Sequence, residues 1–123
     1  MSEAFTDQVL VVISCGTDNP NRATRGFQMA MAAHKTGKKV TVFLLDEGVF
    51  LARKGMADSV RAATGDSASD HITYCQEFEI PIIACTPCAK SRQIGEADLI
   101  EGARLGTAPE LIELSCRSAV ISL

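Results

Sequence analysis

Two cysteines three residues apart, Cys85 and Cys88, are the residues of this chain best suited to chemistry. They lie in the segment ACTPCAKSR, with Lys90 and Arg92 close behind. A Cys-x-x-Cys pair can supply half of a zinc site, a redox dithiol, or a nucleophilic thiol that carries sulfur beside a second thiol. Both residues can also be small apolar parts of the core, because free cysteine is often buried.

The sequence around the pair favours a reactive thiol. Cys85 closes a short apolar run, Thr86 is a good helix N-cap, and Pro87 is tolerated at the first helical position. We therefore expect a short helix from Pro87 towards Ile94. Its free N–H groups and the basic side chains behind it favour a thiolate. We expect an electropositive pocket with an exposed thiolate, and a lowered pKa for one of the two cysteines.

The competing interpretations of the pair fit less well. Structural zinc needs four Cys or His ligands, and the chain has no second Cys-x-x-Cys. Its histidines, His34 and His71, fall within expected helices far from the motif. A thioredoxin-like dithiol usually follows an early strand, whereas little chain remains after this motif. The polar tail AKSRQ argues against simple burial, and we expect no metal.

The three other cysteines receive structural interpretations. Cys75 lies on the apolar face of an expected helix, and Cys116 lies at a helix end. Cys15 ends the first apolar run, in SCGTDN, at the edge where a site is expected, but the structural interpretation is favoured there too.

Further polar residues point to the same edge. GTDNPN is a Gly, Asp and Asn-rich turn that enters a helix and could present N–H groups to an anion. It lacks the G-x-G-x-x-G and G-x-x-x-x-G-K-[ST] patterns, so we expect no nucleotide cofactor. Asp46 and Glu47, in LLDEGV, form either an acidic rim or a solvated turn.

Short apolar runs rich in β-branched residues indicate the fold. They are typical of parallel strands covered on both faces. The runs are Val9–Ile13, Val40–Leu45, Ile80–Ala84 and Ala119–Leu123. In such sheets, sites lie at the carboxyl ends of the strands.

Helical patterns separate these runs. Pro20 to Lys35 is an expected helix, capped by Asn19 and ended near Gly37. Further helices are expected over 56–63, 67–78 and 107–116, with ARLG as a short edge strand. The sequence therefore predicts one α/β domain over 1–123. It has three layers, α/β/α, around a mostly parallel sheet of about five strands.

Composition excludes several classes of protein. The 123 residues carry 12 basic and 15 acidic groups, a net charge of −3, so no basic footprint for nucleic acid is present. No apolar run approaches the roughly 18 residues of a membrane span. The first residues, MSEAFTDQ, are unlike a secretory signal, and we expect a cytoplasmic protein. Its five cysteines are then expected to be mostly reduced thiols.

Three stretches carry a resemblance to the DsrE/DsrF family of sulfur-relay proteins, which includes the TusD-like carriers. They are VLVVISCGTDNPNRATRGFQMAMAAHKTGKKVTVFLLDEGV, EFEIPIIACTPCAKSRQI and DLIEGARLGTAPELIELSCRSAVISL. The resemblance covers nearly the whole chain and is least distinctive from Phe50 to Ser69. It implies a compact α/β sheet and assembly into homotrimers or homohexamers.

The resemblance also implies a function. Sulfur carriers of this family bear a persulfide on a strand-end cysteine that matches Cys85, and a basic position seven residues on matches Arg92. A glycine often follows that basic residue, whereas Gln93 stands here. Cys88 is an addition relative to carriers with one cysteine. The implied protein is a sulfur carrier, served by donor and acceptor proteins, rather than a turnover enzyme.

Two alternatives stay open beside the carrier. One is a thiol-redox protein or sensor that cycles a Cys85–Cys88 disulfide. The other is a non-catalytic oligomeric binding module. Within the carrier hypothesis, Cys88 either attacks a persulfide on Cys85 or tunes the Cys85 thiol through a weak hydrogen bond, and we favour the tuning role.

Overall fold

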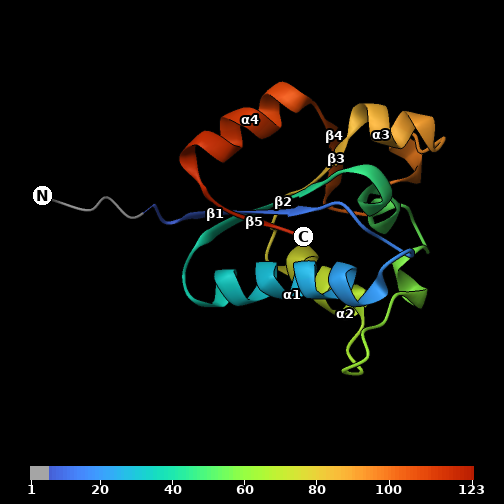
Figure 1. Ribbon diagram of the computed structural model, residues 1–123, viewed down its shortest axis with the longest axis horizontal. Coiled ribbons are helices and arrows are strands. Elements are labelled where there is room, and N and C mark those ends of the chain that lie inside the picture. The colour runs from blue at the N-terminus through green and yellow to red at the C-terminus, as the bar shows by residue number, and fades with distance from the viewer. Residues whose placement is uncertain (1–5) are drawn as a thin grey trace, which may run out of the picture.

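The computed structural model describes residues 6–123, and its centre is one five-stranded sheet (Figure 1). The strands are β1 (Gln8–Ile13), β2 (Lys39–Leu44), β3 (Ile82–Cys85), β4 (Ala103–Gly106) and β5 (Ala119–Ser122). Their order is β4-β3-β2-β1-β5, and every pairing is parallel. The predicted strands and parallel α/β fold are confirmed. The expectation that the first residues are not a secretory signal rests on MSEAFTDQ, of which residues 1–5 lie outside the described residues.

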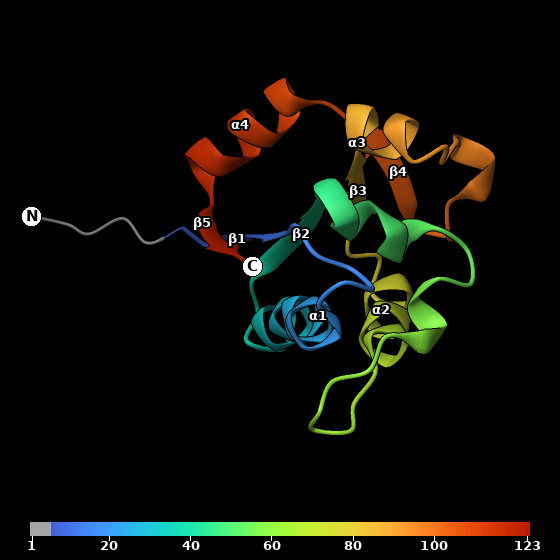
Figure 2. The same ribbon diagram turned by 45° about the vertical axis from the view of Figure 1, so that its right-hand side comes forward.

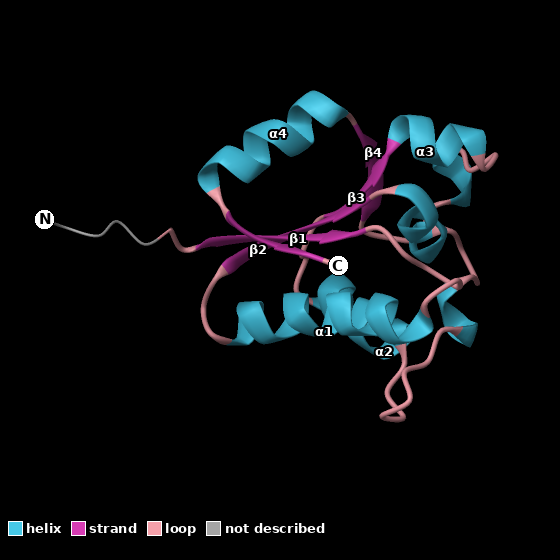
Figure 3. Cartoon of the chain, viewed as in Figure 1, coloured by secondary structure: helices cyan, strands magenta, loops and turns pink. Residues whose placement is uncertain are grey.

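Helices cover both faces of the sheet (Figure 3). They are α1 (Pro20–Lys35), α2 (Ala68–Glu77), α3 (Thr86–Ser91) and α4 (Ala108–Arg117). Figure 1 shows α1 and α2 on one face, with α3 and α4 on the other. The Asn19 side chain caps α1 by accepting a hydrogen bond from the Arg22 N–H at 3.2 Å, as the sequence predicts.

The helix predicted over 56–63 is wrong. Only the short 3₁₀ helix Ala57–Ser59 forms there. The Val60 carbonyl accepts from the Ala68 N–H at 2.9 Å, and the Ala62 N–H donates to the Asp66 carbonyl at 2.9 Å. Gly65, at φ 98°, supports the reversal between them. Because these backbone groups bond across a turn, they cannot continue a helix.

Strand register brings the expected site residues to one edge. Ile13 of β1 pairs with Leu44 of β2, and Leu44 pairs with Ala84 of β3. Cys85 then pairs with Gly106 of β4. The loops that follow β1, β2, β3 and β4 therefore emerge together. Figure 2 shows the 3₁₀ helix Asp46–Ala52, which follows β2, beside α3.

Strands β3 and β5 differ in burial. All four residues of β3 are buried, whereas all four of β5 are exposed, and α4 has no buried residue. Exposed apolar side chains gather on these last two elements: Ile112, Val120 and Ile121 are 63%, 46% and 36% exposed. Within residues 6–123, no helix combines the length and the apolar character that a membrane span requires.

Candidate functional site

Cys85 lies where β3 passes into α3. It is the last residue of the strand and also the N-cap of the helix, so the prediction of Thr86 as N-cap is off by one residue. The reason is that the Thr86 hydroxyl donates across to the Gly106 carbonyl at 2.6 Å and does not cap. The helix ends at Ser91, short of the predicted end, because Gln93 adopts a left-handed backbone, with φ 58°. Gln93 thus takes the conformation that glycine favours.

The two thiols differ in burial. Cys85 is only 7% exposed and belongs to the apolar core, whereas Cys88 is half-buried at its margin. The expectation of an exposed thiolate is therefore wrong for Cys85. The strand that carries this residue has β2 and β4 as its neighbours and contacts α3 and the 3₁₀ helix Asp46–Ala52.

The expected lowering of a thiol pKa does not hold for Cys88, whose pKa is raised. Burial raises the pKa of Cys88, and the Cys85 side chain raises it further through a hydrogen bond and its charge. The Asp46 backbone N–H opposes this rise, while the Asp46 carboxylate adds to it. Cys88 is therefore a thiol at neutral pH, and its side chain faces Cys85 closely enough for the two to interact.

Asp46 is the residue that sequence reasoning undervalued. It lies two residues after the end of β2 and has a left-handed backbone, with φ 47°. Its Oδ1 accepts a weak hydrogen bond from the Cys88 thiol, with Sγ at 3.9 Å. The predicted acidic rim therefore contacts the cysteine motif across 42 residues of sequence.

The Arg92 side chain contacts the cysteine motif at the backbone carbonyl of Cys88 and not at a sulfur atom. The Arg92 Nη1 donates to the Cys88 carbonyl at 3.1 Å and to Ser91 Oγ at 3.0 Å. Its Nε and Nη2 bind the two oxygens of Glu47, at 3.2 and 2.5 Å. This pair lowers the pKa of Glu47 and raises that of Arg92. Because Glu47 balances its charge, Arg92 does not make the expected electropositive pocket.

Two glycines hold the acidic loop in place. A Cβ added to Gly48 would lie 2.2 Å from the Ile13 carbonyl oxygen, and one added to Gly16 would lie 2.4 Å from that of Glu47. The Leu45 N–H also donates to the Ile13 carbonyl at 2.9 Å. The loop after β2 is thus packed backbone to backbone against the end of β1. The sequence feature that marks this close packing is the glycine in GTDN and in DEGV.

The remaining cysteines belong to other parts of the chain. Cys75 is buried in α2, where burial raises its pKa to about 12, so the core interpretation is confirmed. Cys15 is also buried, and burial followed by the Asp18 charge raises its pKa. Cys116 is exposed on α4 and therefore lies outside the core of the chain. Within the GTDNPN turn, Asp18 accepts a hydrogen bond from the Gly16 N–H at 2.8 Å, so this N–H is already bonded inside the turn.

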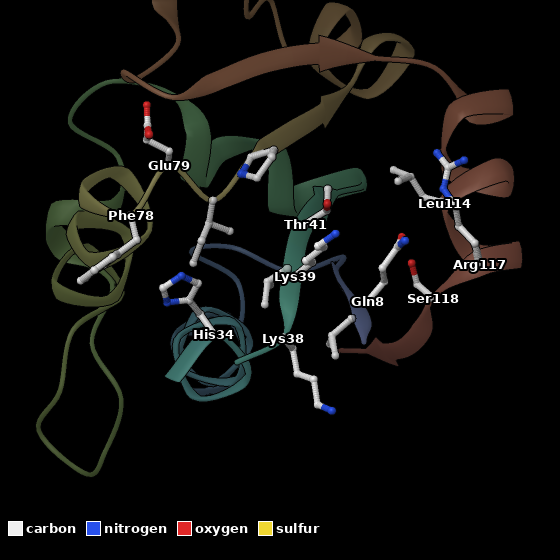
Figure 4. A pocket seen from close by; sticks show the side chains of 14 residues that line it. Gln8, His34, Lys38, Lys39, Thr41, Phe78, Glu79, Leu114, Arg117 and Ser118 are labelled. Carbon is white, nitrogen blue, oxygen red and sulfur yellow. The ribbon is translucent and has the colours of Figure 1, made fainter. Parts of the chain in front are cut away.

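A large cavity lies at the opposite edge of the sheet (Figure 4). It measures about 630 Å³ and is lined at the amino ends of β1 and β2 by residues that include Lys38, Lys39 and Arg117. The carboxyl ends of α1 and α4 meet this edge, and free carbonyls there favour positive charge. The basic lining thus has a structural explanation, and neither Cys85 nor Cys88 lines the cavity.

Comparison with known proteins agrees with this architecture. The chain belongs to the DsrE/DsrF-like family, which it matches over residues 7–122. It is 35% identical over 107 residues to the uncharacterized protein MK0008 of Methanopyrus kandleri, covering 86% of this chain and 84% of that one. The crystal structure of the YchN protein from E. coli is similar at a TM-score of 0.79 and 18% identity, covering 97% of this chain and all of that one.

A second solved structure has the same fold. It is the protein of unknown function MTH1491 from Methanobacterium thermoautotrophicum, with a TM-score of 0.70 and 14% identity over 94% of this chain and 98% of that one. At these identities the two structures establish the fold alone. The family implies a sulfur-relay type of fold, and the role of the individual cysteines rests on the site.

Proposed function

We propose that this protein is a sulfur carrier that accepts a sulfane sulfur on Cys85 and passes it to an acceptor thiol. The observation that supports the proposal most is the position of Cys85, at the carboxyl end of β3 with the Cys88 thiol facing it. Carboxyl strand ends are where parallel α/β sheets place their sites. The family resemblance gives the strand-end cysteine its carrier role.

The transfer needs only exchange between sulfur atoms. The Cys85 thiolate attacks the sulfane sulfur of a polysulfide or of a persulfide on a donor protein. A bond forms from Cys85 Sγ to that sulfur, the donor S–S bond breaks, and its electron pair leaves with the donor thiolate. In the second half, an acceptor thiolate attacks the outer sulfur, and Cys85 leaves as a thiolate. No net oxidant or reductant is required.

Burial of Cys85 suits a slim sulfur donor. With 7% of the residue exposed, a chain of sulfur atoms reaches the thiol more easily than a bulky reagent does. A persulfide held there is also shielded from oxidants, which react most readily with exposed, thiolate-rich sites. We propose that the carrier works in the cytoplasm, where thiols stay reduced.

We further propose that the carrier is one domain that assembles as a homotrimer or a hexamer of two trimers. The support from this chain is the apolar surface of α4 and β5, where Ile112 is 63% exposed and Val120 is 46% exposed. Exposed apolar patches commonly mark protein–protein contacts. The trimeric arrangement itself comes from the family resemblance.

A redox dithiol is the second candidate, because Cys85 lies close enough to Cys88 to raise the pKa of the Cys88 thiol. In that case the pair would cycle between two thiols and a disulfide. A binding module without thiol chemistry is the third candidate. These three functions differ in the mass change that each produces at the cysteines.

Intact-mass analysis after exposure to polysulfide tests the proposal. We expect a gain of one sulfur atom that a reductant removes, and no such gain in Cys85→Ser. Cys116→Ser, which changes an exposed thiol on α4, is the matched control and should load like the parent. Full loading of Cys85→Ser would overturn the assignment. Loss of two hydrogens in place of a sulfur gain would favour the redox dithiol, and unreactive cysteines would favour the binding module.

A further inference from the structure

The second thiol of the motif poses a problem for a carrier. If Cys88 attacks Cys85 Sγ of a persulfide, a Cys85–Cys88 disulfide forms and the bond from Cys85 Sγ to the sulfane sulfur breaks. The electron pair leaves with that sulfur as hydrosulfide, which takes up the proton that Cys88 has released. The carrier would then discharge without an acceptor. Since the thiolate is the nucleophile, the state and direction of the Cys88 thiol decide whether this occurs.

The Cys88 thiol is engaged by Asp46 from a different element. Asp46 begins the 3₁₀ helix Asp46–Ala52, and its Oδ1 lies 3.9 Å from Cys88 Sγ. Its position is fixed by the backbone. The preceding Leu45 N–H donates to Ile13 at 2.9 Å, and the Gly48 N–H donates to Leu45 at 2.8 Å. The carboxylate therefore reaches Cys88 from a rigid loop.

The left-handed backbone of Asp46 is a second observation at the same place. A φ of 47° is costly for a residue with a side chain, although less so for Asp and Asn than for most others. Glycine would adopt this conformation without strain. Strained residues that the surrounding structure holds in place are concentrated at functional sites.

Asp46 presents a carboxylate to the Cys88 thiol. Arg92 binds the Cys88 carbonyl, but its guanidinium is paired with Glu47. The other titratable neighbour is Cys85. A carboxylate beside a thiol disfavours the thiolate. In agreement, the Asp46 carboxylate adds to the raised pKa of Cys88, after burial and Cys85, while the Asp46 backbone N–H acts in the opposite direction.

We propose that Asp46 is a positioning residue that accepts the Cys88 S–H and so prevents Cys88 from expelling a sulfur held on Cys85. The proposal rests on the carrier function and gives Asp46 a role in retaining the cargo. On this basis a Cys-x-x-Cys motif can serve a relay, because the second thiol is directed towards a carboxylate and kept protonated.

The test compares the parent with Asp46→Asn, which removes the charge and keeps an oxygen acceptor. Both proteins are loaded with polysulfide and freed of excess reagent, and hydrosulfide release and disulfide formation are followed over time. We expect roughly several-fold faster discharge in Asp46→Asn near neutral pH, because the carboxylate charge no longer disfavours the Cys88 thiolate. Its rate–pH profile should shift to lower pH. In Cys88→Ala and in Cys88→Ala with Asp46→Asn, discharge should be slow and equal.

Asp46→Gly separates the proposed role from a role in folding. Glycine relieves the left-handed backbone, so this variant should unfold no more easily than the parent and yet discharge faster. If both Asp46 variants discharge at the parent rate, or if the acceleration persists without Cys88, the proposal is overturned.

A second probe keeps this result apart from the carrier proposal. Oxidised glutathione drives disulfide formation between Cys85 and Cys88 without any sulfane sulfur. If the parent takes up no sulfur but Asp46→Asn forms this disulfide faster than the parent does, the carrier function fails and the Asp46 role stands. If the parent loads and neither reaction is faster in Asp46→Asn, the Asp46 role fails alone. Without loading and without acceleration, both proposals fail.

Discussion

Arg92 and Glu47 form a two-point ion pair that joins α3 to the 3₁₀ helix after β2. The guanidinium Nε and Nη2 lie 3.2 and 2.5 Å from the two Glu47 carboxylate oxygens. The third nitrogen binds the Cys88 carbonyl at 3.1 Å, and the guanidinium lies 6.0 Å from the Phe50 ring centre. The pair therefore holds the cysteine motif and the acidic loop together, and its removal should affect both.

Replacing Glu47 by Gln should lower the unfolding temperature at neutral pH. The ion pair holds the pKa of Glu47 below its ordinary value of 4.5. Its stabilisation is therefore present above that ordinary value and is lost as pH falls through the lower folded-state pKa. The difference in unfolding temperature between parent and variant should accordingly shrink in acid. Thermal unfolding from neutral to acid pH measures this difference.

Glu113→Gln is the control for that experiment. Glu113 meets Arg117 at 3.4 Å on the exposed surface of α4, and such pairs contribute little. Its unfolding temperature should stay near that of the parent across the pH range. Equal behaviour of the two variants would show that the Arg92 pair has no special role in joining α3 to the loop.

Gly48→Ala should be strongly destabilising, by about 3 kcal/mol, which is the upper part of the range for overpacking. The new Cβ would lie 2.2 Å from the Ile13 carbonyl oxygen, and backbone cannot move away as a side chain does. Gly55→Ala is the control. Gly55 has a left-handed φ of 84° but nothing within 4 Å of the added atom, so about 1 kcal/mol is expected. Urea unfolding should separate the two, and equal losses would contradict the packing argument.

The thiols of Cys88 and Cys75 should differ in their rates of alkylation in the folded protein. Half-buried Cys88 should react first. Cys75 should react last, because it is buried and its pKa is raised to about 12, which leaves almost no thiolate near neutral pH. Peptide mapping after timed iodoacetamide treatment gives the order. Early labelling of Cys75 without unfolding would contradict the burial described for α2.

Ile112→Glu should weaken or abolish self-association. Ile112 is 63% exposed on α4, and a carboxylate buried at an apolar contact is costly to desolvate. Ala32→Glu, on the exposed side of α1 across the sheet, is the control and should assemble like the parent. Light scattering at micromolar concentration measures both masses. A monomeric parent would refute the proposed oligomer, and an Ile112→Glu protein of parental mass would place the contact elsewhere.

Much of the fold could be predicted because the strands carry unusually clear patterns. Val9–Ile13 and Ile80–Ala84 are short β-branched runs with no alternation, as expected for buried parallel strands. Asn19 before Pro20 marked the start of α1 with a specific cap. The helix expected over 56–63 did not form, because backbone hydrogen bonds between residues 60–62 and 66–68 turn the segment back on itself.

The site was harder to predict than the fold, because its contacts cross the sequence. The segment ACTPCAKSR identified Cys85, Cys88 and Arg92, but no local pattern indicated that Arg92 binds Glu47. The contact from Asp46 to Cys88 likewise depends on the register of β2 and β3. The burial of Cys85 follows from the strand order, which local sequence does not specify.

Cys88→Ala should still accept sulfur on Cys85 and retain it at least as long as the parent does. The reason is that the variant removes the one internal nucleophile that faces Cys85, as far as residues 6–123 are concerned, so expulsion of hydrosulfide loses its route. The small side chain leaves α3 intact, because Cys88 is half-buried and its thiol makes only a weak hydrogen bond to Asp46. Intact-mass analysis over time, without an acceptor, gives the lifetime of the loaded protein. If Cys88→Ala instead loses all reactivity, and the parent cycles readily with a disulfide reductant, the redox dithiol replaces the carrier as the function of this motif.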